Sequence, residues 1–153
     1  MFRRSIVTEE LQDLARRIAE NIANNGQTAS GMTARSLEVV DENDSIALYG
    51  RKAFGAMETG RKGGRVPRNF SAILYQWSLD KGIAFADERE RRSFAYLLAK
   101  KIQKEGTELF REGGRSDVYS NEITQTIENI TKRISKSLQT EIQTIPLNNA
   151  NNK

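Results

Sequence analysis

The residues that could do chemistry in this chain are carboxylates, because the sequence contains no histidine and no cysteine. The usual general base at neutral pH, the commonest metal ligand and the thiolate nucleophile are therefore missing. Acidic residues cluster in three places: Glu9-Glu10, Asp41-Glu42 with Asp44, and Asp87-Glu88 with Glu90. The first and third clusters suit the positive ends of helices and the second suits a turn. We therefore predict no catalytic residue, no enzymatic activity, no cofactor and no metal ion.

Two glycine-rich segments, residues 60–65 and 106–115, have the composition of phosphate-binding loops without their spacing. Neither shows the pattern of Gly, four residues and Gly-Lys-Ser/Thr, nor the Gly-x-Gly-x-x-Gly of dinucleotide-binding folds. Two interpretations stay open for each segment. It is either a loop whose glycines serve backbone turns, or a contact with nucleic-acid phosphates.

The net positive charge lies in the first of these regions. The sequence has 24 Lys and Arg against 20 Asp and Glu, a net charge of +4. Residues 59–79 hold no acidic residue and four basic ones, Arg61, Lys62, Arg65 and Arg68. This segment predicts contact with DNA phosphates or with an acidic protein surface. Because no compact set of base-reading side chains accompanies it, any DNA contact would be non-specific and salt-dependent.

The elements that position these groups must share a modest core. The 153 residues are 37% hydrophobic and 7% aromatic, and the mean hydropathy is −0.63. This composition favours helices that share apolar stripes, or helices completed by a neighbouring subunit. The longest apolar run, residues 94–99, is far shorter than the roughly 20 residues that cross a bilayer. With no cysteine and no secretory signal, we expect a reducing, aqueous compartment and no membrane contact.

Apolar periodicity predicts a first helix over residues 8–25 with Thr8 as its N-cap, followed by a loop over 27–35. Residues 37–40 and 46–49 form two predicted strands around a polar turn at 41–45. Residues 70–81 predict a short helix, in which Tyr75 and Trp77 are core residues rather than platforms for bases. The next predicted helix runs from a capping box at Asp87 and Glu90 to about residue 105. Its apolar stripe is Phe94, Leu97, Leu98 and Ile102.

The final predicted helix, from about residue 120 to 145, has the most regular stripe. Its members are Ile123, Ile127, Ile130, Ile134, Leu138, Ile142 and Ile145. Such a helix would be about 39 Å long, which is more than a body of this size can cover. The stripe predicts either a core-facing surface or a seam between subunits, and we favour subunit contact by Ile123 to Ile142 because uncovered isoleucines promote aggregation.

Together these elements predict a single α+β domain over residues 1–153. It consists of a small antiparallel β-hairpin packed by amphipathic helices, with a long C-terminal helix. Pro146 and the asparagine-rich end cannot continue that helix, so a disordered tail is expected from about residue 147.

Two segments and the order of elements resemble the tail-completion and head–tail joining (neck) proteins of tailed bacteriophages, including the version found in crAss-like phages. Gly31-Met-Thr-Ala-Arg-Ser-Leu37 is similar to the family's Gly-x-Leu-x-x-Ser-Ile segment, which enters the first strand. Phe54-Gly-Ala-Met-Glu-Thr-Gly60 is similar to its Tyr-Ala-x-x-Val-Glu-x-Gly-Thr segment after the second strand. The resemblance covers about residues 8–145. The basic run after Gly60 and the helix with Trp77 depart from the pattern, which leaves the neck and the tail as alternative positions.

The resemblance implies a structural virion protein without enzymatic activity or cofactor, made in the host cytoplasm. Such proteins form homo-oligomeric rings, and bind portal, connector or tail-tube proteins around the DNA channel. On this basis Arg61, Lys62, Arg65 and Arg68 are expected to face genomic DNA or a partner ring. The alternative prediction is a small non-specific DNA-binding protein that acts through the basic glycine-rich loop.

Overall fold

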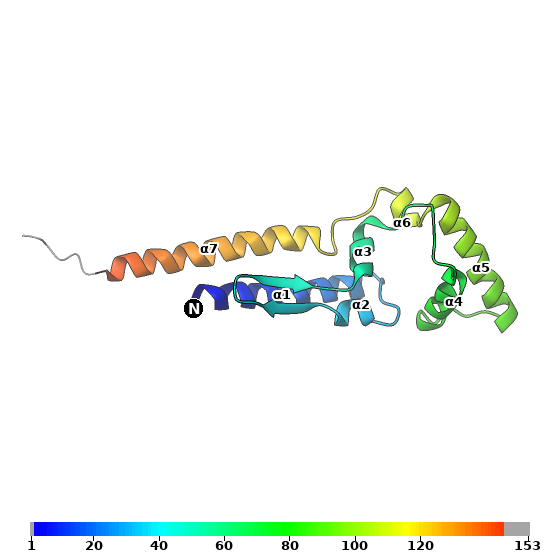
Figure 1. The fold of residues 1–153 in the computed structure, drawn as a ribbon, viewed down its shortest axis with the longest axis horizontal. Coiled ribbons are helices and arrows are strands. Elements are labelled where there is room, and N and C mark those ends of the chain that lie inside the picture. Colours follow the sequence, from blue (N-terminus) through cyan, green and yellow to red (C-terminus); the bar gives the residue numbers. More distant parts are fainter. Residues whose placement is uncertain (1, 146–153) are drawn as a thin grey trace, which may run out of the picture.

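The protein is mostly helical, with one two-stranded hairpin packed against its first helix. The computed structural model describes residues 2–145. Helices α1 (Phe2–Asn24) and α7 (Ser120–Thr144) lie side by side and form an elongated half of the molecule (Figure 1). Helices α4 (Phe70–Asp80) and α5 (Glu88–Glu105) form the other end. The predicted fold class, a hairpin packed by helices with a long C-terminal helix, is confirmed.

The hairpin joins β1 (Glu38–Asp41) to β2 (Ile46–Tyr49) in antiparallel register, with Val39 opposite Leu48. Its first strand begins one residue later than predicted. The turn closes through a bond from Glu42 N–H to the Ser45 carbonyl of 2.8 Å. Helix α1 lies along one face of the hairpin, and the Arg4 guanidinium donates to the Asn43 carbonyl and to the Asp41 carboxylate at the turn.

The main core lies where α1 meets both the hairpin and the start of α7. Leu14, Ile18 and Ile22 of α1 are buried together with Val118. The half-buried residues around them come from the hairpin region and from the segments that follow it: Leu11, Ala34, Leu37, Leu48, Phe54, Met57 and Tyr119. The predicted stripe of the first helix is therefore a core stripe.

The first helix begins at Phe2, so the prediction of a start at residue 8 with Thr8 as N-cap is wrong. Ile6 is only 3% exposed and continues the buried face of the helix one turn upstream. Contacts outside the helix hold this extra turn in place, because Arg4 binds the hairpin turn and Arg3 pairs with Glu141 of α7. The segment 27–35, predicted as a loop, contains the short helix α2 (Met32–Arg35) after Gly31 in a left-handed conformation.

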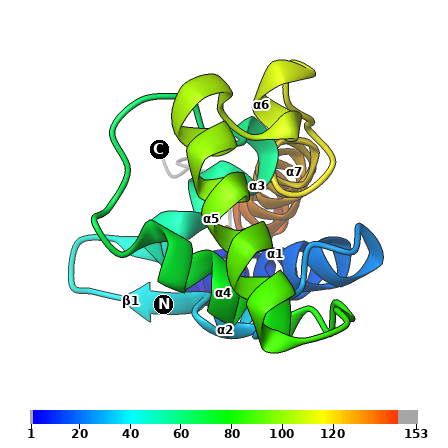
Figure 2. The ribbon, with the colours of Figure 1, turned by 90° about the vertical axis from the view of Figure 1, so that its right-hand side faces the viewer.

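Helices α4 and α5 pack on each other around a second, separate cluster of buried residues, and Figure 2 shows the two helices side by side. Leu74 of α4 meets Ala95, Ala99 and Ile102 of α5 there. The prediction that Leu97 belongs to the core stripe is wrong, since its side chain is 65% exposed. The small alanines let the two helices approach closely, so that the contact turns toward the alanine face.

The predicted capping pair of α5 is confirmed at Asp87, while the return bond of Glu90 goes to the residue before the N-cap rather than to the N–H of Asp87. Asp87 accepts a 2.8 Å bond from the Glu90 N–H, and Glu90 accepts a 2.7 Å bond from the Ala86 N–H. Short elements join the two ends of the molecule: the 3₁₀ turn η1 (Lys52–Gly55), α3 (Ala56–Thr59) and α6 (Glu108–Arg111). Among residues 2–145, no helix is long and apolar enough to cross a membrane. The predicted tail from about residue 147 lies outside the described residues.

Candidate assembly surface and basic loop

Helix α7 contacts α1 through a seam of polar side chains. Arg17 of α1 donates from Nε to Glu122 at 2.7 Å and from Nη2 to the Thr126 hydroxyl at 2.7 Å. Asn21 donates to the Val118 carbonyl and to Glu122, each at 3.2 Å. Thr126 is only 2% exposed, so this part of the seam is closed to water.

The seam continues toward the N-terminus of α1 with further ion pairs. Arg133 of α7 donates to Glu10 at 2.9 Å and to Glu9 at 2.6 Å. Glu10 is 8% exposed, and it also accepts a bond from Asn129. The order of these contacts shows that α1 and α7 run antiparallel, and the last pair is Arg3 with Glu141 at 3.0 Å.

The polar seam leaves the isoleucine stripe of α7 on the surface. Ile127 is 59% exposed, Ile142 is 66% exposed, and Ile123, Leu138 and Ile145 are exposed as well. Ile130 and Ile134, at the edge of the stripe next to α1, are half-buried. We expected the stripe to be uncovered because the body is too short. The structure gives a different reason for the exposure of the stripe. Helix α1 packs along α7, but it contacts a polar face of α7 that points away from most of the stripe.

Glu58 of α3 is a residue that the sequence analysis missed, and it fixes the start of α7. It is 3% exposed, and its Oε1 accepts bonds from the N–H groups of Val118 at 3.0 Å, Tyr119 at 2.6 Å and Ser120 at 2.8 Å. The Ser120 hydroxyl donates to its Oε2. A carboxylate at this position satisfies the unpaired donors of a helix N-terminus and complements the helix dipole. The only trace in the sequence is the Met-Glu-Thr-Gly segment, whose partner lies 60 residues away.

The electrostatics of Glu58 follow from these bonds. Burial raises the pKa of the carboxyl, but the hydrogen bonds from Ser120, Tyr119 and Val118 outweigh burial, so the pKa lies below its ordinary value of 4.5. The neighbouring Tyr119 has a raised pKa because it is half-buried and faces the Glu58 charge. Glu58 is therefore a structural anion, matched to a helix end rather than poised to exchange protons.

The two glycine-rich segments pack against each other. Thr107 N–H donates to the Arg61 carbonyl at 2.9 Å, and Gly64 N–H donates to the Gln103 carbonyl at 2.7 Å. A Cβ on Gly60 would stand 2.5 Å from Phe110 N, and a Cβ on Gly106 would stand 2.6 Å from the Arg61 carbonyl oxygen. Both glycines have positive φ. Gly60 and Gly106 thus allow close backbone contact and turns, as the first of the two interpretations expects; a contact with nucleic-acid phosphates stays a prediction.

Arg61 differs from the other three basic residues of its segment. Its guanidinium donates to the Arg65 carbonyl at 2.8 Å and lies over the Phe70 ring at 5.3 Å. Its backbone N–H donates to the Thr107 hydroxyl at 2.9 Å. Arg61 is half-buried by these contacts and holds the segment in shape.

Lys62, Arg65 and Arg68 are the exposed part of the basic segment. Within residues 2–145, none of the three side chains forms an ion pair with a carboxylate. The segment meets the C-terminal turn of α5 at Gly63, next to the Lys104 carbonyl, and Lys104 is exposed as well. We call Lys62, Arg65 and Arg68 the basic loop. Residues 60–116 as a whole contain 13 Lys and Arg against 7 Asp and Glu, so the α4–α5 end of the molecule is positive.

The predicted carboxylate clusters occupy structural positions. Asp87 caps α5 as predicted, and Asp41 pairs with Arg4 at the hairpin turn. The prediction that Glu9 and Glu10 lie at the start of a helix is wrong, because α1 begins at Phe2 and both residues pair with Arg133 of α7 instead. In the described part of the chain, no group of three acidic residues lies close enough to hold a metal ion.

A broad groove of about 920 Å³ separates the α1–α2 region from α4. Ile22, Met32 and Met57 line one side, and Ile73 and Trp77 line the other. Trp77 is half-buried there, whereas Tyr75 packs on the α4–α5 core. The expectation of a core position thus fits Tyr75 better than Trp77.

The two segments that carry the family resemblance both pack on the main core. Ala34 and Leu37 from the first segment and Phe54 and Met57 from the second pack on the main core. The comparisons with known proteins add nothing to this likeness, because no family model, no curated protein and no solved structure matches the chain.

Proposed function

We propose that this protein is a structural component of a tailed bacteriophage particle that assembles with copies of itself into a ring in the neck or tail. The observation that carries the proposal is the exposed stripe of α7. Helix α7 makes its contact within the chain through polar groups, while its apolar residues Ile127 and Ile142 stay in water. Leaving large apolar side chains in a continuous exposed row is unfavourable, and such rows mark interaction surfaces.

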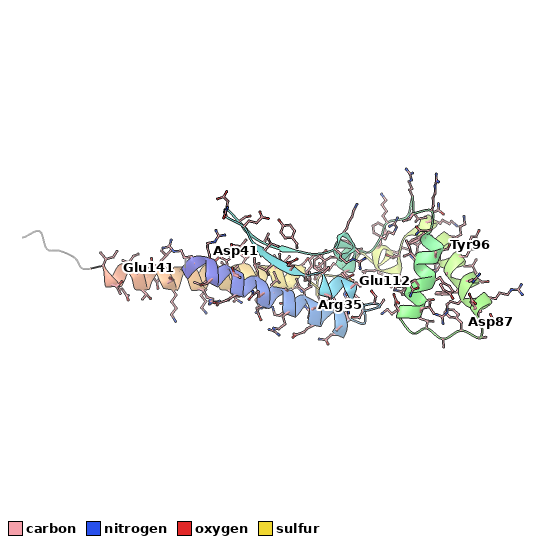
Figure 3. All side chains as sticks on the ribbon, turned by 60° about the horizontal axis from the view of Figure 1, so that its bottom comes forward. Arg35, Asp41, Asp87, Tyr96, Glu112 and Glu141 are labelled. Atoms are coloured by element: carbon pink, nitrogen blue, oxygen red, sulfur yellow. The ribbon has the colours of Figure 1, made fainter. Side chains whose placement is uncertain are left out.

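The shape of the chain supports assembly into a ring. Figure 3 places Glu141 near one end of the molecule and Tyr96 and Asp87 at the opposite end. The positive α4–α5 end and the apolar stripe of α7 are thus distinct surfaces on one elongated chain. In a ring, every copy presents both surfaces on the same sides, so that the basic loop becomes a band of charge. That band would face the DNA channel or an acidic surface of an adjacent portal, connector or tail-tube protein.

The test of self-assembly uses the two most exposed isoleucines of α7. We expect the wild-type chain to form oligomers at micromolar concentration in native mass spectrometry, and the double variant Ile127→Ser with Ile142→Ser to remain monomeric with an unchanged helical circular dichroism spectrum. The matched control is Lys132→Ser with Gln143→Ser, since both residues are exposed on the other side of the same helix. A wild-type chain that stays monomeric up to millimolar concentration would contradict the proposal.

The place in the particle needs a second experiment. Electron cryomicroscopy of intact particles is expected to show density for this chain, with its elongated α1–α7 half and its α4–α5 end, between the portal and the tail tube. Purified particles that contain no copy of the chain would contradict a virion role even if the pure protein forms rings.

A second candidate, a non-specific DNA-binding protein, rests on the lack of carboxylate partners at the basic loop. If Lys62, Arg65 and Arg68 each neutralise one phosphate, the dissociation constant for duplex DNA should rise about 40-fold between 50 and 200 mM salt. The triple glutamine variant should abolish this dependence. Strong duplex binding by the monomeric Ile127→Ser, Ile142→Ser chain would favour this candidate over the ring.

A further inference from the structure

We infer that the outer face of α5 and the basic loop form one surface that binds the phosphates of duplex DNA without reading its sequence. This inference rests on the proposed function and deepens it, because it names the partner of the positive end of the molecule. It also adds a helix face to the contact that the basic loop makes.

The outer face of α5 carries cations without carboxylate partners. Its residues are spaced by 4, 3, 4 and 4 positions on the side opposite the buried residues of α5, with Lys101 at the edge: Arg89, Ser93, Tyr96, Lys100 and Lys104. The four basic side chains of this face are exposed. Among residues 2–145, no carboxylate forms an ion pair with any of the four. The Lys100 ammonium lies 5.6 Å from the centre of the Tyr96 ring.

The acidic residues of α5 are engaged away from this face. Glu88 pairs with Arg92, one turn along the helix. Glu105 lies 3.7 Å from Arg111 of α6, and Glu90 accepts a backbone bond at the start of the helix. The four cations of the outer face are therefore available to an external anion.

The basic loop continues the outer face of α5 at its C-terminal end. Gly64 N–H donates to the Gln103 carbonyl at 2.7 Å, which holds the loop against the last turn of the helix. Figure 2 views this end of the molecule, with α5 toward the reader. The face spans about 22 Å along the helix axis from Arg89 to Lys104. Together with the loop it presents seven exposed basic residues: Lys62, Arg65, Arg68, Arg89, Lys100, Lys101 and Lys104.

The residue types of this surface favour nucleic acid over an acidic protein. Four of the seven basic residues are lysines, which are depleted in protein–protein interfaces. Leu97 is the one exposed aliphatic side chain beside Tyr96, and a single leucine makes no apolar docking site. Lysine and arginine contacts with phosphates are, by contrast, the main source of sequence-independent DNA binding.

Duplex DNA fits the surface better than a single strand or a lipid surface. Single-strand sites combine a basic groove with several aromatic platforms, whereas the basic loop and α5 expose one aromatic ring, Tyr96, on the outside of a helix. Helices that lie on membranes insert their apolar face, and the apolar face of α5 is packed against α4. A duplex carries one phosphate charge per about 1.7 Å of its axis, so that a face of this length can meet several phosphates.

The salt dependence of DNA binding tests the inference. The dissociation constant of the wild-type chain for a short duplex of mixed sequence, measured by fluorescence anisotropy, should rise about 6,000-fold between 50 and 200 mM salt if each of the seven cations neutralises one phosphate. The quadruple variant Arg89→Gln, Lys100→Gln, Lys101→Gln, Lys104→Gln should keep about a 40-fold rise, and the triple glutamine variant of the basic loop about a 150-fold rise. If the basic loop were the only contact, the quadruple variant would keep the wild-type dependence and the triple variant would lose it.

The matched control makes the same change of charge outside the α4–α5 end. It is the quadruple variant Arg51→Gln, Lys52→Gln, Lys132→Gln, Lys136→Gln. These residues are exposed, and in the described part of the chain they form no ion pair. The control should bind the duplex as the wild type does, and circular dichroism should show the same helix content in all variants.

The outcomes separate this inference from the proposal on which it rests. Equal salt dependence in the wild type and the α5 quadruple variant would overturn the inference. So would tighter binding, at equal salt, to a single strand of the same length, to polyglutamate or to phosphatidylserine vesicles. Oligomers in native mass spectrometry that bind no duplex would overturn the inference while the ring stands. A chain that binds the duplex as expected and never oligomerises would support the inference and refute the ring.

Discussion

Replacing Glu58 removes the group that connects α3 to the start of α7. In Glu58→Ala, the N–H groups of Val118, Tyr119 and Ser120 lose their acceptor, and Val118 is fully buried. An unpaired buried donor costs about 1–3 kcal/mol and the loss of a helix cap about 0.5–2 kcal/mol. We therefore expect the free energy of unfolding to fall by about 2–4 kcal/mol. For a chain of this size, that lowers the melting temperature by about 5–15 °C.

The variant Glu58→Gln separates charge from shape. It keeps one acceptor oxygen of similar position and loses the charge, so we expect a loss of about 1–2 kcal/mol at pH 7. Because the pKa of Glu58 is lower in the folded than in the unfolded chain, the carboxylate stabilises the fold fully above its ordinary value of 4.5. This stability is lost as the pH falls from 4.5 through the lower folded value. The difference between wild type and Glu58→Gln should therefore narrow at low pH.

The assay is urea unfolding followed by circular dichroism at pH 7 and at steps below pH 4.5, with hydrogen exchange at residues 118–120 as the local measurement. Glu128→Gln is the matched control, since Glu128 is exposed on the same helix and should change the stability by less than about 0.5 kcal/mol. If Glu58→Ala unfolds at the wild-type urea concentration, or if the gap for Glu58→Gln is the same at every pH, the capping role is refuted.

Three further predictions concern the backbone contacts, the basic segment and the seam. Gly60→Ala should lower the free energy of unfolding by more than about 2 kcal/mol in thermal unfolding, because φ is positive there and the new Cβ would stand 2.5 Å from Phe110 N. The control Gly55→Ala has open space around the new Cβ and should be within about 0.5 kcal/mol of wild type. Arg61→Gln should lower the melting temperature by several degrees, because it loses the contacts with Phe70 and the Arg65 carbonyl. The triple variant Lys62→Gln, Arg65→Gln, Arg68→Gln should leave the melting temperature unchanged. Equal melting temperatures for Arg61→Gln and the triple variant would contradict the structural role of Arg61. Arg133→Ala should destabilise the chain by about 1–3 kcal/mol in urea, since it leaves Glu10 buried without its cation, and Glu10→Gln in the same chain should recover part of that loss.

The periodic elements could be predicted from sequence because each depends on local spacing and local caps. The stripe of α7, the capping pair at Asp87 and Glu90, and the polar turn at 41–45 all act within a few residues, and the structure has each of them. The predicted start of the first helix was wrong because contacts with distant parts of the chain extend that helix. The first turn of α1 is held by the hairpin turn through Arg4 and by α7 through Arg3, and no local signal announces either contact.

The candidate site was predictable in its residue types but not in its arrangement. Composition alone located the positive charge in residues 59–79, yet only the packed structure separates Arg61, which is half-buried over Phe70, from the exposed Lys62, Arg65 and Arg68. The sequence does not distinguish one glycine of the two glycine-rich segments from another. The structure does, because backbone atoms about 45 to 50 residues away leave no room for a Cβ at Gly60 and Gly106, whereas Gly64 and Gly113 have open space around them.

The sequence by itself determined that the protein has neither histidine nor cysteine, that its last helix carries a regular apolar stripe, and that a hairpin follows the first helix. Each of these is a property of composition or of spacing along one segment. Only the tertiary structure decided which face of α7 meets α1. That choice depends on polar partners such as Arg17 with Thr126 and Arg133 with Glu10, which lie more than 100 residues apart. Because those pairs occupy one face of the helix inside the chain, most of the isoleucines of the apolar stripe are left exposed.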